Sequence, residues 1–255
     1  MGKVICIYNQ KGGVGKTTTV INLSVAMATT GLFKPNILVL DMDPQGNATS
    51  GLGVDKYTDK NIYTLLNNQS TLEESIYPSK YKKLSIIPST PALTGFEIEA
   101  ISRENRSFIL KEILKGVVDQ YEYIFIDCPP SLGMLSLNAL CASNSVIIPI
   151  QTEYYALEGV SQLKSTYDMV KESLNQELEI EGVLLTMYDS RNNLSQDVVF
   201  EVQSYFQDQV FNTVIPRNIT LAEAPSYGES AISYDKKSRG AKAYIALAKE
   251  IKKKN

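Results

Sequence analysis

Seven short runs rich in β-branched residues constrain the fold of this chain more than any other feature, and most are apolar without interruption. Strands that are buried on both faces have this pattern, because helices cover both sides of a parallel sheet. Helical periodicities separate the runs, such as the apolar i, i+3, i+4, i+7 spacing that begins at Leu110. The alternation predicts an α/β fold, with a mostly parallel, twisted sheet of about seven to eight strands and helices on both faces. The predicted strands are residues 4–8, 37–41, 84–88, 123–127, 145–150, 183–187 and 210–216.

The regularity of this alternation indicates one domain. No sequence period of about 20 to 50 residues repeats and no linker rich in Pro, Gly or Ser interrupts the pattern, so we expect a single domain over residues 1–255. The longest apolar runs fall far short of the roughly 20 residues that span a bilayer. Because the N-terminal segment also lacks the features of a signal peptide, we expect a cytoplasmic protein.

The composition excludes several kinds of chemistry. The chain has no histidine, which rules out Ser-His-Asp triads, Cys-His dyads and HExxH zinc sites. Its three cysteines, Cys6, Cys128 and Cys141, lie in or beside apolar runs without the short spacings of metal-cluster sites, so we expect buried free thiols. The formal net charge is -3, so any contact with a polyanion must be local.

A glycine-rich segment follows the first predicted strand and precedes an apolar helical stretch at residues 20–28. Residues 10–18 are Gln-Lys-Gly-Gly-Val-Gly-Lys-Thr-Thr, which in this setting predicts a phosphate-binding loop. Its glycines would let backbone N–H groups surround phosphate oxygens, Lys16 would neutralise the β- and γ-phosphates, and Thr17 would bind Mg²⁺ directly. The alternative is an ordinary turn that caps a helix. The predicted nucleotide-binding residues of the loop are Lys11, Gly12, Gly13, Val14, Gly15, Lys16, Thr17 and Thr18.

The loop departs from the usual G-x-x-x-x-G-K-[ST] pattern at its first position, which is Gln10, and it carries an additional lysine, Lys11. In this form it resembles the deviant Walker A loop of the ParA/MinD superfamily of P-loop ATPases. The resemblance implies that Lys11 crosses to the nucleotide of the partner subunit in an ATP-bound homodimer. Spacing alone leaves open that Lys11 is a solvated lysine beside the loop.

Further segments extend the resemblance over nearly the full length of the chain. Residues 38–47 resemble the superfamily's Asp-x-Asp-Pro-Gln switch segment, and residues 123–131 resemble its Walker B strand. Residues 154–159 and 214–218 are similar to the Soj branch of ParA proteins, although the second segment could also be a strand ended by proline and a turn. The resemblance implies that two residues border the adenine base: Pro216 and Asn218.

Three carboxylates at predicted strand ends suit magnesium and water. Asp43 precedes a proline, a position from which it can orient the attacking water or merely shape a turn. Asp127 ends an apolar run, where an unpaired carboxylate is costly unless a Mg²⁺-bound water balances it. Asp41 either shares the magnesium shell through water or simply ends its strand. The predicted catalytic residues are Lys11, Lys16, Asp43 and Asp127, and the predicted metal contacts are Thr17 directly and Asp41, Asp43 and Asp127 through water.

Positive charge is concentrated at the C-terminus. The last 20 residues contain eight Lys and Arg side chains and one acidic residue, Glu250, which can hold phosphate backbones on one face or can be a solvated helix end. Soj-type relatives bind DNA without sequence preference through basic residues of the ATP dimer, although Thr220 stands where relatives can carry a basic residue. The predicted DNA-binding residues are Arg191, Arg217, Lys242, Lys252, Lys253 and Lys254.

The resemblance implies an ATPase that dimerises with ATP, binds double-stranded DNA in the nucleoid, and is released when a ParB-like partner stimulates hydrolysis during chromosome or plasmid segregation. The main alternative is a MinD-like membrane-associated positioning ATPase, in which an apolar stripe over residues 241–248 would contact lipid. Its small Ala residues favour packing against the protein, so we expect no stable membrane association. The cysteine positions argue against an electron donor like nitrogenase iron protein, and the early loop argues against an N-terminal helix-turn-helix.

Overall fold

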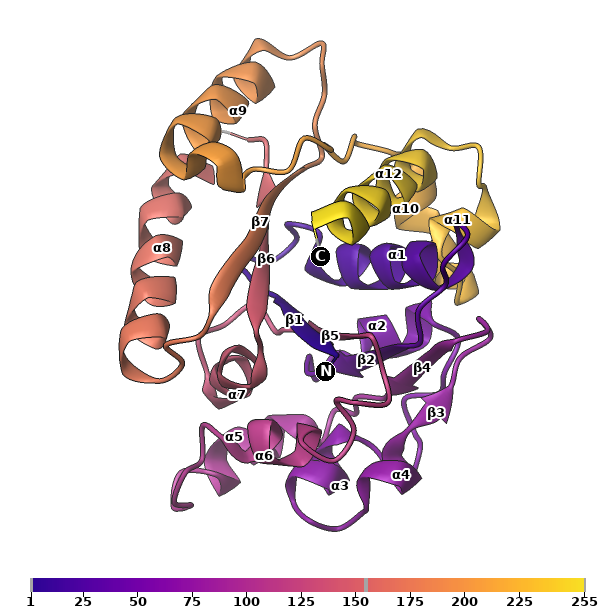
Figure 1. The fold of residues 1–255 in the computed structure, drawn as a ribbon, viewed down its shortest axis with the longest axis vertical. Helices are drawn as coiled ribbons and strands as arrows, with labels where there is room; N and C mark the ends of the chain where they lie inside the picture. The colour runs from indigo at the N-terminus through magenta and orange to yellow at the C-terminus, as the bar shows by residue number, and fades with distance from the viewer. Residues whose placement is uncertain (1, 154–155, 255) are drawn as a thin grey trace.

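The chain folds around one seven-stranded sheet in the computed structural model, which describes residues 2–153 and 156–254 (Figure 1). The strand order is β3-β4-β2-β5-β1-β6-β7, and every neighbouring pair is parallel except β3 with β4. The predicted α/β fold is therefore confirmed. The strands are β1 (Lys3–Ile7), β2 (Ile37–Asp41), β3 (Tyr77–Pro78), β4 (Leu84–Ile87), β5 (Tyr123–Asp127), β6 (Ser145–Gln151) and β7 (Glu179–Thr186).

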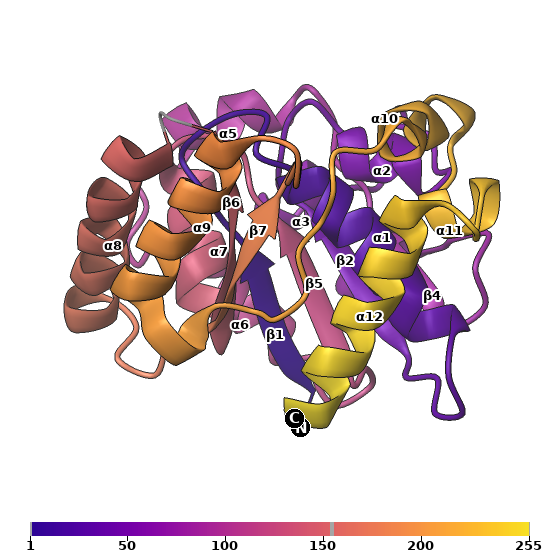
Figure 2. The same ribbon diagram turned by 90° about the horizontal axis from the view of Figure 1, so that it is seen from above.

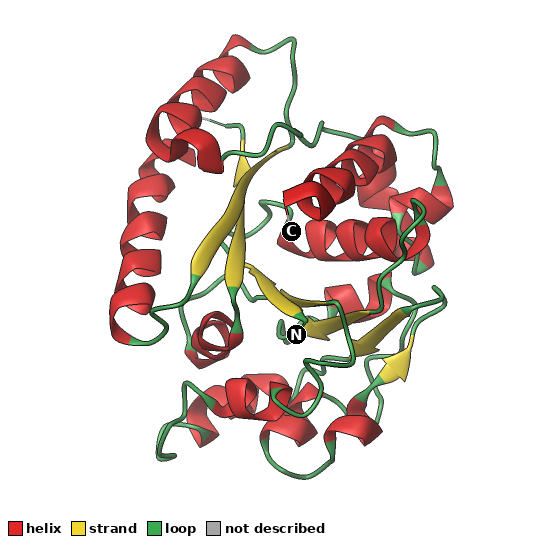
Figure 3. Cartoon of the chain, viewed as in Figure 1, coloured by secondary structure: helices red, strands yellow, loops and turns green. Residues whose placement is uncertain are grey.

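Helices connect the strands and cover both faces of the sheet (Figure 3). α8 and α9 lie on the opposite side of β6 and β7 from α1 and α12, as two perpendicular views agree (Figures 1 and 2). The helices are α1 (Lys16–Thr29), α2 (Asn47–Gly51), α3 (Ile62–Leu66), α4 (Leu72–Ser75), α5 (Leu93–Glu99), α6 (Ile109–Leu114), α7 (Met134–Ala142), α8 (Ala156–Ser173), α9 (Asn193–Phe206), α10 (Ile219–Glu223), α11 (Ala231–Tyr234) and α12 (Arg239–Lys254), with short 3₁₀ turns at Gln207–Gln209 and Ala224–Tyr227.

The two faces of the sheet bury two separate hydrophobic cores. Side chains of a strand alternate between faces, and β1 illustrates the result. Val4 and Cys6 pack with residues of α7 and α8 in one core, whereas Ile5 and Ile7 pack with residues of α1 and α12 in the other. Both sides of each central strand are thus apolar, which explains the uninterrupted runs in the sequence. The three cysteines are buried and free, as predicted.

The predicted strand at residues 210–216 is wrong. This segment runs beside β7 but touches it only at isolated points, where the N–H groups of Phe211 and Ile215 donate to β7 carbonyls at 2.9 and 2.8 Å. Between those points the N–H groups of Asn212 and Thr213 donate to the Glu250 carboxylate of α12, at 2.7 and 3.0 Å. The α12 carboxylate therefore takes the N–H of Thr213, which a continuous strand would direct at β7 between those of Phe211 and Ile215.

The seventh strand is instead β3, which the sequence did not predict. It has two residues, one of them Pro78, and pairs antiparallel with β4 at the edge of the sheet. Such a short strand leaves no apolar run to detect, and proline suits a sheet edge because it has no N–H to donate.

Gly182 of β7 offers a test of packing between the sheet and the 210–216 segment. A Cβ at this position would lie 2.4 Å from ring atoms of Phe211. We expect Gly182→Ala to lower the free energy of unfolding by about 1–3 kcal/mol, because the ring must move. The matched control is Gly159→Ala in α8, where a Cβ meets no atom within 4 Å and alanine favours the helix. Denaturant titration of both variants checks this; an unchanged Gly182→Ala midpoint would contradict the packing.

Candidate active site

The carboxyl ends of three central strands meet at one edge of the sheet. The register pairs Ile7 of β1 with Asp127 of β5, and Asp127 with Asp41 of β2. The glycine-rich loop leaves from β1, and Asp43 follows β2 by two residues. Because parallel strands end at the same edge, the loop and the three predicted carboxylates lie in one place although the sequence separates them by more than a hundred residues.

The loop exposes backbone donors at the start of α1. Gly13 and Gly15 have φ angles of 73° and 94°, a left-handed conformation that residues with side chains rarely adopt. Gly15 is also the N-cap of α1 and has no side chain that could accept a hydrogen bond from the N–H groups of the first turn. A helix N-terminus with free N–H groups and positive dipole end binds anions readily. Gly12 and Gly13 are exposed whereas Val14 is buried, so the loop opens outward on one side.

Lys16 is folded back into this loop. Its side chain is 6% exposed, and its Nζ donates to the carbonyl of Lys11 at 2.9 Å. Burial lowers the pKa of Lys16, while the negative charges of Asp127 and Asp43 oppose that change. The ammonium is therefore within electrostatic reach of both carboxylates, and its hydrogen bond to an uncharged carbonyl is one that an anionic ligand can replace. Lys11 itself is exposed at the leading edge of the loop.

Asp127 is the most unusual group of the site. It is fully buried, and neither carboxylate oxygen has a hydrogen-bond partner among the residues that the structure describes. Burial and the neighbouring Asp41 charge raise the pKa of Asp127 well above its ordinary value, and the nearby Thr17 hydroxyl and Lys16 ammonium only partly oppose them. A buried carboxylate without a partner is costly, and a hydrated cation would satisfy both oxygens. These residues fit Mg²⁺ held through water.

Asp41 has partners that the sequence did not reveal. Its Oδ1 accepts from the N–H of Asp43 at 3.1 Å, and its Oδ2 accepts from the N–H and hydroxyl of Thr49 at 2.8 and 2.7 Å. Burial raises the pKa of Asp41 to about 6, although these hydrogen bonds oppose the shift. Asp41 therefore fixes the segment between β2 and α2, and its predicted contact with the magnesium shell stays a prediction.

Asp43 shapes a turn, which is one of the two roles considered for it from the sequence, whereas its role in orienting the attacking water stays a prediction. Its Oδ1 accepts from the N–H of Gln45 at 2.9 Å, so it shapes a turn. It is 8% exposed and close enough for its charge to act on Lys16 and Asp127. In the described part of the chain, no group of three or more Cys, Asp or Glu side chains forms a complete metal cage. A Mg²⁺ ion bound here would need oxygens from water and from a phosphate ligand.

A cavity of about 230 Å³ adjoins the loop and contains both residues predicted to border a base. Asn218 contributes a buried side-chain oxygen without a hydrogen-bond partner among the described residues. Thr186, which the sequence analysis missed, closes the cavity and donates from its hydroxyl to the carbonyl of Val14 at 2.8 Å. Its position at the carboxyl end of β7 is the feature of the sequence that could have identified Thr186 as a site residue. The lining residues are Gly15, Thr18, Thr186, Met187, Ile215, Pro216, Arg217, Asn218, Leu221, Ala222 and Tyr244.

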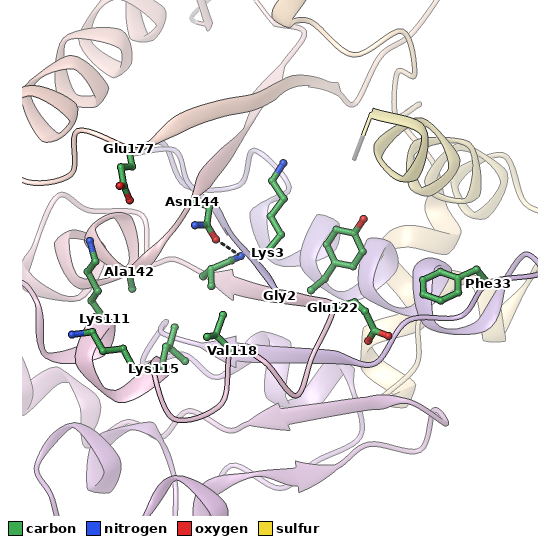
Figure 4. A pocket seen from close by; sticks show the side chains of 13 residues that line it. Gly2, Lys3, Phe33, Lys111, Lys115, Val118, Glu122, Ala142, Asn144 and Glu177 are labelled. Atoms are coloured by element: carbon green, nitrogen blue, oxygen red, sulfur yellow. Dashed lines mark hydrogen bonds between the residues drawn. The ribbon is translucent and has the colours of Figure 1, made fainter.

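A larger cavity, of about 670 Å³, lies at the opposite edge of the sheet (Figure 4). Several of its polar groups have partners within the protein: Lys3 pairs with Glu181 at 2.6 Å, and Asn144 accepts from the N–H of Val4 at 2.8 Å. Lys115, the residue after α6, pairs with Glu112 of that helix. The buried oxygens of Asp127 and Asn218, which lack partners among the described residues, lie instead at the carboxyl edge, despite the smaller cavity there.

The structure separates the predicted DNA-binding residues into two groups. Arg191 and Arg217 lie beyond the carboxyl end of β7 and pair with Asp189 and Glu153, each at 2.7 Å. Lys242 and Lys253 are exposed on α12. The remaining two have structural partners: Lys252 donates to the carbonyls of Met27 and Phe33 at 2.9 and 3.0 Å, and Lys254 donates to the carbonyl of Glu181 at 2.7 Å.

The apolar stripe of α12 packs against the protein, as predicted. Ala241, Tyr244 and Ala248 are buried in the core that also contains α1, and the Tyr244 hydroxyl is 3.0 Å from that of Thr19. Among the described helices, none is long and apolar enough to cross a bilayer. Of the segment 154–159, residues 154 and 155 lie outside the described part of the chain.

Comparison with known proteins identifies the family. Residues 2–180, more than half of the chain, match the family model described as AAA domain. The chain is 51% identical over 257 residues to the chromosome partitioning protein ParA of Myxococcus xanthus, covering 100% of this chain and 89% of that protein. It is 52% identical over 252 residues to the sporulation initiation inhibitor protein Soj of Bacillus subtilis, covering 98% of each. The chain belongs to the ParA/Soj family.

Solved structures related to the ParA/Soj family share the fold of this chain. Cobyrinic acid a,c-diamide synthase from Mycobacterium smegmatis, with bound ATP analog and magnesium, superposes with a TM-score of 0.85 at 33% identity, covering 98% of this chain and 93% of that one. The septum site-determining protein MinD from Pyrococcus horikoshii, complexed with Mg-ADP, gives a TM-score of 0.80 at 28% identity over 99% and 97% of the chains. The P-loop fold within the ParA/MinD superfamily is confirmed.

The unpaired charge of Asp127 predicts an unusual dependence of stability on pH. Because its folded-state pKa is raised, the native protein binds more protons than the unfolded chain, and stability falls as pH rises through that pKa. We therefore expect Asp127→Asn, without ligands, to unfold at a higher temperature than the wild type in mildly alkaline buffer. The difference should shrink on acidification.

Asp189→Asn is the control of opposite sign. The Arg191 guanidinium holds the pKa of Asp189 well below its usual range, so that carboxylate stabilises the fold at neutral pH and loses this effect in acid. Thermal unfolding across pH measures both variants. A lower midpoint for Asp127→Asn at alkaline pH would show that its carboxylate has a partner after all.

Proposed function

We propose that the chain is a DNA-partitioning ATPase that hydrolyses ATP to ADP and phosphate, weakly alone and faster with a ParB-like partner. ATP binding drives homodimerisation and binding to double-stranded DNA, and hydrolysis releases the protein from the nucleoid. Chromosome partitioning is the function named for the M. xanthus relative, which supports a chromosome as cargo. The bound ATP analog and magnesium of a related structure support ATP and Mg²⁺ as ligands.

One observation carries the ATPase proposal: the fully buried Asp127 carboxylate without a partner, next to a lysine held at the N-terminus of α1. The Asp127 carboxylate and the Lys16 ammonium belong to the same site, and neither has a strong partner of opposite charge in the described part of the chain. A nucleoside triphosphate with Mg²⁺ would supply a partner for each group, because the cation would bind near the carboxylate and the phosphates would bind the lysine and the helix N-terminus.

The protein's own residues define the steps. Lys16 leaves the Lys11 carbonyl for the β- and γ-phosphates, where its charge stabilises the transition state. The N–H groups of residues 12–18 surround the phosphates, and the Asn218 oxygen can accept from the exocyclic amine of a base in the adjoining cavity. Asp43 orients the attacking water, and its turn with Gln45 holds it in place. Asp41 keeps Asp43 in position through the Asp43 N–H.

The MinD-like alternative has less support in this molecule. Membrane association through α12 would require its apolar residues to leave a core in which Tyr244 and Leu247 are 1% and 0% exposed. Burial of an aromatic side chain and a leucine is worth several kcal/mol, roughly 1.5–3 kcal/mol for each. Detachment would therefore unfold one face of the protein.

Two lysines of the loop should give different defects. We expect Lys16→Ala to abolish binding of ATP with Mg²⁺, because backbone donors cannot replace the missing charge. Lys11→Ala should bind ATP normally but fail to dimerise or hydrolyse it. Calorimetry measures binding and light scattering measures the dimer. Near wild-type ATP affinity in Lys16→Ala would refute the loop assignment, and a normal Lys11→Ala dimer would refute the role of Lys11 in the partner subunit's site.

The basic residues should separate into those that bind DNA and those that support the fold. Binding to phosphates makes affinity fall log-linearly with salt, and the slope decreases by about one when a side chain that touches a phosphate is replaced by alanine. We expect Arg217→Ala and Lys242→Ala to reduce that slope for unrelated duplexes in the presence of ATP. Lys252→Ala should instead lower stability by about 0.3–1 kcal/mol, because its ammonium caps the C-terminal end of α1. Sequence-selective or ATP-independent binding would contradict the partition function.

A further inference from the structure

The residue before Lys11 is bound to a helix that is distant in sequence. Gln10 Nε2 donates to Thr166 Oγ1 of α8 at 2.8 Å, a contact between residues 156 positions apart. Thr166 is 7% exposed, and its hydroxyl donates to the carbonyl of Gln162 at 3.1 Å. Since the hydroxyl proton is used within α8, the oxygen is free to accept from Gln10. The hydrogen bond therefore has a fixed direction and links the loop to α8.

The backbone around Lys11 is held from two more sides. The Lys11 N–H donates to Asn9 Oδ1 at 2.9 Å, and Asn9 Nδ2 donates in turn to the carbonyl of Pro149 in β6 at 2.7 Å. The carbonyl of Lys11 accepts from Lys16 at 2.9 Å. The main chain of Lys11 and the side chains of Asn9 and Gln10 are therefore held by hydrogen bonds. Lys11 is nevertheless exposed to solvent.

Position 10 is where the loop departs from the usual pattern, which has glycine there. Gln10 is not among the residues with positive φ, so its backbone does not require glycine. The side chain instead supplies a contact that glycine could not make. A requirement for a rigid leading edge of the loop explains both observations: glutamine replaces glycine at position 10, and its side chain hydrogen-bonds to α8.

We propose that Gln10 and Thr166 are positioning residues for Lys11, fixing the leading edge of the loop against α8 so that the Lys11 ammonium projects toward the nucleotide of a second subunit. This rests on the proposed role of Lys11 in the homodimer. A side chain that must reach across an interface binds more tightly when its backbone is already ordered, because association then costs less conformational entropy. Nucleotide binding within one subunit depends on residues 12–18 and is not affected.

Three variants test the proposal: Gln10→Ala, Thr166→Val and the double substitution. ATP affinity is measured by calorimetry, and dimerisation with ATP and Mg²⁺ by analytical ultracentrifugation. Each single variant should weaken the dimer about three- to tenfold, the range expected for one hydrogen bond, with ATP affinity within about twofold of the wild type. The double variant should be no weaker than either single one, because both remove the same contact.

Two further variants separate positioning from general support of α8. Thr166→Ser keeps the hydroxyl and should restore wild-type dimerisation. Tyr167→Phe removes a different buried hydrogen bond of α8, from the Tyr167 hydroxyl to the carbonyl of Leu178 at 2.9 Å, and should lower stability without changing the dimer. Normal dimerisation of Gln10→Ala and Thr166→Val, additive effects in the double variant, or an equal defect in Tyr167→Phe would each overturn the proposal.

Lys11→Ala in the same assay distinguishes this inference from the proposed function. If Lys11→Ala fails to dimerise while the Gln10 and Thr166 variants match the wild type, only the positioning role is wrong. If Lys11→Ala itself dimerises normally, the role of Lys11 in the partner subunit's site is wrong, and the positioning role falls with it.

Discussion

The register between β2 and β5 places Asp41 and Asp127 opposite each other at the ends of neighbouring strands, and the chemistry of this edge follows from that constraint. Two carboxylates in a buried site cannot both be ionised cheaply without compensation. The protein compensates one of them, since Asp41 accepts three hydrogen bonds from Asp43 and Thr49. It leaves the other, Asp127, without a partner among the described residues. One carboxylate therefore organises the polypeptide, and the other is prepared for a cation.

α1 joins this edge to the C-terminal helices. Its first residues follow the glycine-rich loop, and its buried polar side chains bind elsewhere: Thr19 contacts the hydroxyl of Tyr244 on α12, and Asn22 accepts from the N–H of Ala231 on α11 at 2.8 Å. Lys252 then caps the other end of α1. Both ends and the middle of α1 are thus tied to the layer that forms the adjoining cavity.

The sequence predicted the sheet and the loop because both depend on local patterns. Uninterrupted apolar runs report burial on both faces, and glycines at positive φ report a conformation that other residues avoid. The errors came from long-range competition. Residues 210–216 were wrongly predicted as a strand because the Glu250 carboxylate, distant in sequence, accepts from the N–H groups of Asn212 and Thr213. The two carbonyl partners of Lys252 are equally distant in sequence and could not be predicted, while its DNA-binding role stays a prediction. The partner of Gln10, Thr166, also lies far away in the sequence, so no local motif could reveal it.

Thermal unfolding of the wild-type protein with ATP alone, Mg²⁺ alone and both together tests most directly whether Asp127 is prepared for a cation held with a nucleotide. A ligand that binds only the native state raises the midpoint according to its affinity. If the cation and the nucleotide complete one site, the two together should raise the midpoint by more than the sum of their separate effects. An increase with ATP that is the same with and without Mg²⁺ would contradict the proposed role of Asp127.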